Sequence, residues 1–278
     1  VSYENLQKSN NDRYEYVFPY YNYSTTLSED FFNGNLNFSS SGNNFLSNTN
    51  QLKSSVNNNL KFNSKEFIWL NGVENSFEIN TKNLNSVGKN NSEYKSSPQI
   101  ELMSEFNFNM KYPLLKINKN NFNYLTPKVL LKVNPSDMKN YSSLDRTIDV
   151  NNIFNTNRLG VDDTLETGKS LTLGLDFKKE SQIDPNKFFE IKLASVLRDK
   201  EEIFIPENST LNKKNSNLFG SISNNFSDFF NIKYNFAIDK NLNNIEYNDL
   251  STTFTLDNFT TEFSFLEESG AMGNSNFL

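Results

Sequence analysis

The chain has 278 residues, with 27 Lys and Arg against 33 Asp and Glu, a formal net charge of -6, and neither Cys nor His. Zinc sites built from Cys or His, Cys nucleophiles and Ser-His-Asp relays within the chain are therefore excluded. The acidic balance argues against a nucleic-acid binder, which normally presents a basic face. The mixture of Asn with 26 Phe and 12 Tyr fits either a prion-like disordered chain or a folded one, and periodicity distinguishes them.

Alternation of apolar and polar residues runs through most of the sequence and predicts β-strands. The clearest case is Gln99 to Tyr112, where Ile100, Leu102, Phe106 and Phe108 fall on one face. About twelve strands and no helix are expected. In chain order they are Tyr14 to Ser24, Phe31 to Ser39, Val56 to Phe62, Val73 to Lys82, Gln99 to Tyr112, Phe122 to Val133, Ser170 to Lys179, Lys187 to Arg198, Asn217 to Asn224, Asp228 to Asp239, Ile245 to Asp257 and Phe259 to Leu266.

Two all-β architectures fit strands with one apolar and one polar face. In a soluble sandwich the apolar faces pack together, whereas in an outer-membrane barrel they face lipid and the polar faces line the lumen. The barrel is favoured because the strands are long, their polar faces carry Asn, Lys and Glu in mid-strand, and aromatic residues gather at strand ends. Residues 14–23 are the densest aromatic group, interpreted as an interfacial girdle, with sugar stacking as the alternative.

Loop lengths test the barrel independently, because short periplasmic turns should alternate with longer external loops. The expected external loops are Ser41 to Gln51, Asn83 to Pro98, Asn134 to Lys169, Asp199 to Asn215 and Lys240 to Asn244. Each is longer than the neighbouring turns, as the barrel predicts. No apolar run approaches the ~18 to 20 residues of a membrane-spanning helix.

The longest loop contains NNIFNTNRLGVDDTLETGKS, residues 151–170, whose Gly-Lys-Ser ending is similar to a phosphate-binding loop. Asp163 stands where that loop requires glycine, so a nucleotide site is rejected. The carboxylates of Asp162, Asp163 and Glu166 fit a divalent-cation site, a general acid/base pair or, preferably, a solvated loop, because their spacing matches no calcium loop and no nucleophile with its base is recognisable. Arg158 is expected to pair with Asp163 or Glu166, with contact to a substrate phosphate as the alternative.

The run from Asn134 to Phe177 resembles the barrel of the LptD (OstA, Imp) family of outer-membrane lipopolysaccharide-assembly proteins. The shared pattern is Asn152-Ile153-Phe154, Asn157-Arg158-Leu159, Asp163, Glu166, Gly168 and Leu173-Gly174-Leu175. It continues through Leu197-Arg198-Asp199, PENSTL at 206–211 and residues 216–220. Two departures are Thr164, where the family has Arg, and the absence of the cysteines that many members carry.

The resemblance implies that residues 1–278 are part of a C-terminal transmembrane β-barrel domain, about half of a very large antiparallel barrel. The periplasmic jellyroll domain and the closing strands are expected outside this chain, and Ser275 to Leu278 is interpreted as a truncation. Asn157, Arg158, Asp163, Glu166 and Gly168 form the family-motif loop, with a structural role expected and lipid contact as the alternative. No catalytic, cofactor-binding or metal residue is expected.

The implied function is insertion of lipopolysaccharide into the outer leaflet of a Gram-negative outer membrane, without enzymatic activity or a cofactor. The implied partners are lipopolysaccharide, an LptE-like plug lipoprotein, an LptA-like periplasmic bridge reached through the jellyroll domain, and outer-membrane lipid, with no nucleic acid. Another outer-membrane barrel, such as a porin or receptor, and a secreted β-rich adhesin are the alternatives. A porin or receptor would lack the Asn-Arg to Glu-x-Gly loop pattern, and an adhesin would be water-soluble.

Overall fold

A computed structural model describes residues 2–4, 14–47, 50–90, 94–227, 229–256 and 259–277. Asp228, Asp257 and Leu278, which belonged to predicted segments, lie outside the described residues. The described strands form one 16-stranded sheet in which every pair is antiparallel. Within these ranges, no helix is long and apolar enough to cross a membrane.

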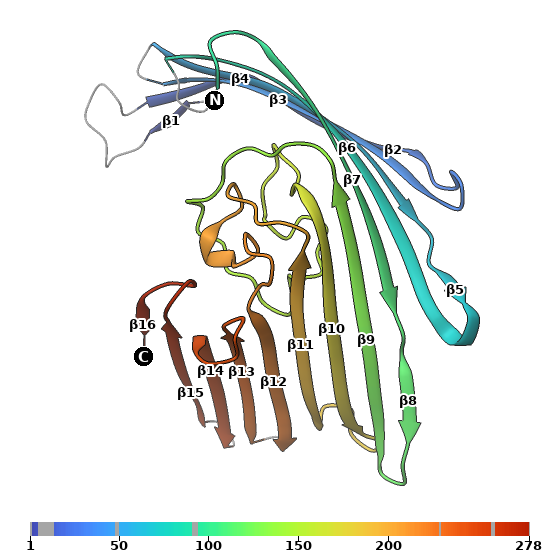
Figure 1. Cartoon of the computed structure of the whole chain (residues 1–278). Helices are drawn as coiled ribbons and strands as arrows, with labels where there is room; N and C mark the ends of the chain where they lie inside the picture. Colours follow the sequence, from blue (N-terminus) through green and yellow to red (C-terminus); the bar gives the residue numbers. More distant parts are fainter. Residues whose placement is uncertain are drawn as a thin grey trace.

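The strands follow one another along the sheet in chain order, apart from two short extensions (Figure 1). They are β1 (Ser2–Glu4), β2 (Tyr14–Ser28), β3 (Gly34–Ser47), β4 (Gln51–Ser64), β5 (Phe67–Trp69), β6 (Val73–Lys89), β7 (Gln99–Lys111), β8 (Leu114–Ile117), β9 (Asn121–Asn134), β10 (Gly168–Ser181), β11 (Phe188–Arg198), β12 (Leu218–Ser227), β13 (Phe230–Ile238), β14 (Ile245–Leu256), β15 (Phe259–Glu268) and β16 (Ser275–Phe277). Two 3-10 turns, η1 (Leu70–Gly72) and η2 (Glu207–Ser209), complete the regular elements.

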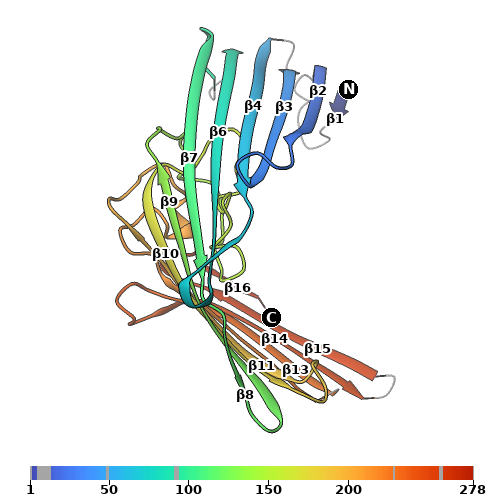
Figure 2. The same ribbon diagram turned by 90° about the vertical axis from the view of Figure 1, so that its right-hand side faces the viewer.

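The predicted all-β fold is confirmed, and so are its twelve long strands. These are β2, β3, β4, β6, β7 and the seven strands from β9 to β15. β5 and β8 pair only with the neighbouring β6 and β9, so each extends the tip of a hairpin, while β1 and β16 are short edge pieces. The sheet is twisted and curved but not closed, because β1 and β16 lie at opposite ends of the strand order (Figure 2).

The two faces of the sheet have the inverted polarity of a membrane protein. On β10, Leu173 and Leu175 are 43% and 40% exposed, whereas Ser170 and Thr172 on the other face are 4% and 0% exposed. In a soluble sandwich the leucines would be covered and the hydroxyls solvated. We call the face carrying these leucines the outer face and the face carrying Ser170 and Thr172 the inner face.

The connections between strands are short at one end of the sheet and long at the other. The turns at 29–33, 70–72, 118–120 and 182–187 join strands at one end, and the longer loops 90–98, 135–167 and 199–217 join them at the other. Alternation is therefore present from residue 90 onward. The predicted loop from Ser41 to Gln51 is wrong, because β3 continues to Ser47 and β4 begins at Gln51. The Ser and Asn residues there form ladder pairs such as Asn44 with Ser54.

The long loops fold back inside the curve of the sheet and make the main hydrophobic core there (Figure 1). Ile148, Ile153 and Leu159 of loop 135–167 pack with Ile205 and Leu211 of loop 199–217. The sheet contributes Ala194, Val196, Phe219 and Ala237 on the inner face of β11, β12 and β13. Ala194, Val196 and Ala237 are small and leave room for the loops, while Phe219 fills the space between them, so the core lies between loops and wall.

Candidate functional site

Loop 135–167, between β9 and β10, carries the residues that the sequence singled out, and local turns shape it. Asp149 accepts hydrogen bonds at Oδ1 from the backbone amides of Asn151 and Asn152, at 2.8 and 2.9 Å, which is an Asx-type turn. Gly160 has φ +70°, a left-handed conformation that favours glycine. Next to it, Arg146 Nε donates to the Arg158 carbonyl at 2.8 Å. The loop therefore approaches the inner face with a defined backbone.

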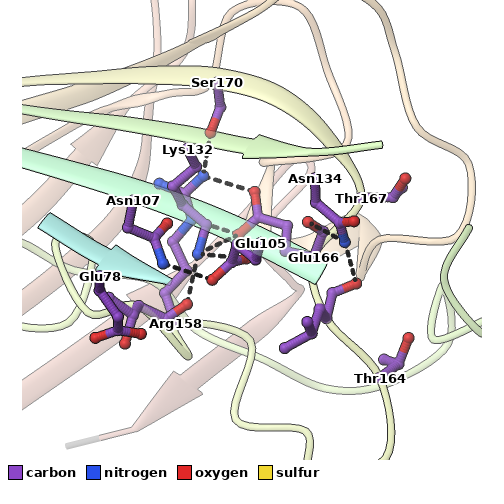
Figure 3. A network of polar contacts seen from close by, with 12 residues as sticks. Glu78, Glu105, Asn107, Lys132, Asn134, Arg158, Thr164, Glu166, Thr167 and Ser170 are labelled. Carbon is purple, nitrogen blue, oxygen red and sulfur yellow. Dashed lines mark hydrogen bonds and ion pairs between the residues drawn. The ribbon is translucent and has the colours of Figure 1, made fainter. Parts of the chain in front are cut away.

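Arg158 and Glu166 form a buried two-point ion pair at the centre of the site (Figure 3). Arg158 Nε donates to Glu166 Oε2 at 2.7 Å, and Arg158 Nη2 donates to Glu166 Oε1 at 2.6 Å. The guanidinium also donates to the hydroxyls of Thr172, at 2.8 Å, and Ser170, at 2.9 Å. The pair thus fastens two points of the loop to each other and to β10.

Three further charged side chains from the sheet surround this pair. Arg198, at the end of β11, donates from Nη1 to Glu166 Oε1 at 2.6 Å. Lys132 of β9 lies 3.0 Å from Glu105 Oε2 of β7 and 4.0 Å from Glu166 Oε2. The side chains of all five residues are at most 3% exposed. We call this group of five residues the buried ion cluster.

Cross-strand register brings the sheet residues of the cluster together. Lys132 is directly opposite Asn107 on one neighbouring strand and Ser170 on the other, and Ser170 is opposite Arg198. All four lie in one row on the inner face. Asn107 Nδ2 donates to Glu105 Oε1 at 2.7 Å, which orients that carboxylate toward Lys132. Arg158 and Glu166 therefore pack against a polar part of the inner face.

The electrostatics of Glu166 follow from this crowding of cations. Burial alone would raise its pKa, but the charges of Arg158, Lys132 and Arg198 and the Arg158 hydrogen bonds outweigh burial and hold the pKa well below the usual range. Glu166 is therefore ionised at neutral pH. A buried charge that loses its partners is strongly destabilising, so the five residues depend on one another.

Asp163 lies in a separate environment from Glu166. Its carboxylate accepts hydrogen bonds from Lys139 Nζ, at 3.0 Å, and from the Tyr141 hydroxyl. Burial raises its pKa, but those two donors outweigh burial and lower it. The neighbouring Asp162 acts through its backbone carbonyl, which accepts from Asn57 Nδ2 at 2.8 Å and from Lys82. The three acidic residues thus have separate structural contacts, and no cluster of three metal-ligating side chains occurs among the described residues.

The two remaining motif residues shape the loop backbone. Gly168 has φ +87°, and a Cβ there would lie 2.9 Å from Arg198 Nη2, so a side chain would press on the cluster. Asn157 is exposed, and its carbonyl accepts from the Gly160 amide at 3.2 Å. Beside it, a cavity of about 170 Å³ lies between the loop and β4, β6 and β7, lined by Asn59, Lys61 and Asn80 among others. A larger cavity of about 780 Å³ lies on the Asp163 side of the loop, lined by Lys139, Tyr141 and Asp163 among others.

Sequence reasoning about the site missed Lys132, Glu105 and Arg198 as partners of the motif. A signal did exist, because Glu105 and Lys132 are charged residues in the middle of apolar strand patterns and Arg198 ends another strand. The sequence does not show the strand register, which places Lys132 and Arg198 in one row of the sheet and Glu105 two positions from that row. Phosphate-loop chemistry is absent, since Ser170 is committed to Arg158 and Lys169 is exposed.

An antiparallel sheet with an apolar outer face, a polar inner face and loops folded inside its curve defines the wall of a transmembrane β-barrel. The LptD family, LPS transport system D, matches residues 1–271, and the chain belongs to that family. No curated protein matches the chain. Membership makes lipopolysaccharide transport and assembly at the Gram-negative outer membrane the function of its family, and the resemblance carried by the 134–177 run is confirmed.

Proposed function

We propose that this chain forms part of a barrel that inserts lipopolysaccharide into the outer leaflet of the outer membrane. The observation that carries the proposal is the family match over residues 1–271 on a sheet with inverted polarity. The lipid chains of the substrate would meet the outer side of the wall, and its sugars the inner side. The chain acts by binding and guiding, with no catalytic step.

The inner face supports the passage of sugars. Asn59, Lys61 and Asn80 line the polar cavity on this face. Amide and ammonium groups form hydrogen bonds with sugar hydroxyls, and many such weak contacts solvate a glycan without holding it tightly. The buried ion cluster meanwhile fixes loop 135–167 across this face, so that the loop narrows the outer mouth of the lumen.

The open sheet bears on the remaining partners. A strand edge exposed to lipid leaves backbone N–H and C=O groups unpaired, which costs several kcal/mol per group. We therefore propose that further strands complete the barrel around this wall. On the basis of family membership, we also propose that an LptE-like lipoprotein fills part of the lumen and that a jellyroll domain receives the lipid from an LptA-like bridge. The motif residues Asn157, Arg158, Asp163, Glu166 and Gly168 are assigned to loop architecture in this scheme.

Depletion of the full-length protein in its own bacterium tests the function. Lipopolysaccharide reaching the cell surface, measured by labelling intact cells with a membrane-impermeant reagent, should fall as the protein is depleted and recover on re-expression. The porin alternative makes a different prediction. If surface lipopolysaccharide stays constant during depletion while the purified protein lets small solutes into liposomes, the insertion function is wrong.

A further inference from the structure

Aromatic side chains gather on the outer face of the sheet at the short-turn ends of β3, β4, β5 and β6. The ring centroid of Phe62 is 6.1 Å from that of Phe31 and 5.5 Å from that of Phe77. The ring centroid of Phe67 is 6.5 Å from that of Phe77 and 6.0 Å from that of Trp69, the only tryptophan of the chain. Because an indole ring favours the boundary between lipid and water, Trp69 marks this end as the periplasmic interface of the wall.

Among these side chains lies an apolar groove of about 410 Å³, within the ~300 to 1,000 Å³ range of ligand pockets, and we call it the aromatic groove. Phe62 forms its floor, since this residue is 8% exposed whereas the neighbouring Leu60 is 40% exposed. Gly34 leaves room for that floor, because a Cβ there would lie 2.6 Å from the Phe62 ring. The lining of the groove includes Phe31, Leu36, Leu60, Phe62, Phe77 and Ile79.

The turn at 29–33 holds a further aromatic side chain of the groove lining, Phe32, in a strained position. Phe32 has φ 46°, in the left-handed region that Asn and Gly adopt readily and aromatic residues rarely adopt. Its side chain is 81% exposed, so contacts within the described part of the chain do little to offset this strain. An exposed aromatic side chain on a strained backbone indicates a contact with a molecule outside the chain.

The polarity of the outer face decides from which side a lipid chain can enter the groove. One row beyond Leu60, toward the long loops, the outward residues are Ser40, Asn58 and Asn83, which bond to one another. A chain entering from the external side would have to cross this polar row, which is unfavourable in hydrocarbon. A chain entering from the short-turn side meets the apolar lining of the groove directly. The groove therefore fits a lipid of the periplasmic leaflet.

An ion pair at the short-turn end of the groove offers contacts to a lipid head group. Lys65 Nζ lies 2.6 Å from Asp30 Oδ1, and the two side chains are 58% and 76% exposed. Asp30 directly precedes Phe31 of the groove. An exposed ion pair contributes only about 0 to 1 kcal/mol to stability, so both groups can turn to a ligand. The Lys65 ammonium matches a phosphate, and the Asp30 carboxylate matches an ammonium group.

The charge balance at this rim indicates which kind of head group fits. Lys65 is the one cation of segments 29–33 and 64–74. Lys111 of β7 brings a second ammonium group to the rim, and it lies 2.7 Å from Glu66 Oε1 and 2.9 Å from Glu74 Oε2. An anionic phospholipid would meet net repulsion, whereas a zwitterionic one presents both a phosphate and an ammonium group. The carboxylates of the two segments are Glu29, Asp30, Glu66 and Glu74.

We propose that the short-turn end of the outer face of β3, β4 and β6 binds one zwitterionic phospholipid of the periplasmic leaflet. One acyl chain lies in the aromatic groove, the phosphate faces Lys65 and the head-group ammonium faces Asp30. The bound lipid anchors the turn at 29–33 to the membrane surface. The site depends on the orientation of the wall in the membrane and not on the insertion of lipopolysaccharide, so the two proposals can fail independently.

Photo-crosslinking of the purified full-length protein tests the site, in vesicles made of equal parts phosphatidylethanolamine and phosphatidylglycerol. A benzophenone side chain replaces Leu60 in the aromatic groove. The matched control replaces Leu125, an outward residue in the short-turn half of β9 that is 36% exposed against 40% for Leu60. Phospholipid adducts should be several-fold more abundant at Leu60 than at Leu125. The adducts at Leu60 should also be enriched in phosphatidylethanolamine, the zwitterionic lipid of the mixture.

Two double variants, each combined with the Leu60 probe, separate the acyl-chain contact from the head-group contact. Phe31→Ala with Phe32→Gly removes one wall of the groove and should lower the adduct yield to the Leu125 value. Glycine suits the positive φ at position 32, so the turn should still form. Lys65→Gln with Asp30→Asn should keep the yield but abolish the enrichment in phosphatidylethanolamine. Folded electrophoretic mobility before heating is checked for every variant.

The outcomes separate the possible explanations. Equal yields at Leu60 and Leu125, measured without any other substitution, would overturn the site. A yield insensitive to the loss of Phe31 and Phe32 would overturn the aromatic groove as the place of the acyl chain. Enrichment in phosphatidylglycerol, or a preference that survives the loss of Lys65 and Asp30, would overturn the head-group assignment. In the native outer membrane, capture of a lipoprotein at Leu60 in place of a phospholipid would overturn the occupant.

Discussion

Replacing Glu166 with Gln removes the charge that three cations share, with almost no change in shape. The amide cannot balance Arg158, Arg198 and Lys132; among the described residues, only Lys132 keeps a second carboxylate, that of Glu105. Removing one partner of a buried ion pair typically costs about 3 to 5 kcal/mol. We expect most of this loss in the local opening of the loop, because the strand ladders of the wall remain intact.

The measurement is hydrogen exchange of loop 135–167 in the full-length protein embedded in lipid. A loss of about 3 to 5 kcal/mol corresponds to an opening constant higher by roughly 10² to 10³·⁵. Glu207→Gln is the matched control, since Glu207 is exposed on the neighbouring loop and takes no part in the buried ion cluster. If E166Q accelerates exchange no more than E207Q does, the cluster does not hold the loop.

Three further expectations concern the same loop. Because the pKa of Glu166 is held below its usual range, its stabilising contribution is complete above about pH 4.5 and is lost as the pH falls through the depressed pKa; the opening free energy of the loop, obtained from exchange rates corrected for the intrinsic pH dependence of amide exchange, should be constant from pH 5 to 8, and a midpoint within that window would contradict the ion pairing. Gly168→Ala puts a side chain at φ +87°, and should cost about 1 to 2 kcal/mol in urea unfolding, whereas an unchanged midpoint would show that the backbone relaxes freely. Lys132→Met should destabilise by about 3 to 5 kcal/mol in the same assay because it strands the Glu105 carboxylate, while the exposed Lys169→Met should change stability by less than about 0.5 kcal/mol; similar values for the two would refute the role of burial.

Much of the wall was predictable because one physical rule, alternation along a strand, repeats in every segment. The segments around Gln99 to Tyr112 and Ser170 to Lys179 were predicted within a few residues of β7 and β10. The rule failed in the Ser- and Asn-rich stretch around Gly42. Such residues have low strand propensity, but the neighbouring strands supply the ladder, and the Tyr21 ring covers the glycine.

The candidate site was predictable only in part. Arg158 and Glu166 share one short loop, so the sequence could suggest their pairing, although it left Asp163 as an equal partner. Arg158 pairs with Glu166 because Asp163 is already hydrogen-bonded to Lys139 and Tyr141. Those hydrogen bonds arise from the folded loop and cannot be read from residue spacing. The sheet partners of the cluster depend on the register across four strands, β7, β9, β10 and β11, which no local pattern determines.

The core formed between the long loops and the wall divides the sheet into mechanically different parts. Around β11 to β13, wall and loops share a core of buried side chains such as Val196, Phe219 and Leu211, so bending the wall there would disrupt the packing of that core. The inner side of β3 and β4 has mostly half-exposed side chains among the described residues, and is supported mainly by its backbone ladders. Deformation under load should therefore concentrate in β3 and β4. A stiff flank and a more flexible flank within one continuous sheet would let the wall bend near β3, away from the core that the loops share with β11 to β13.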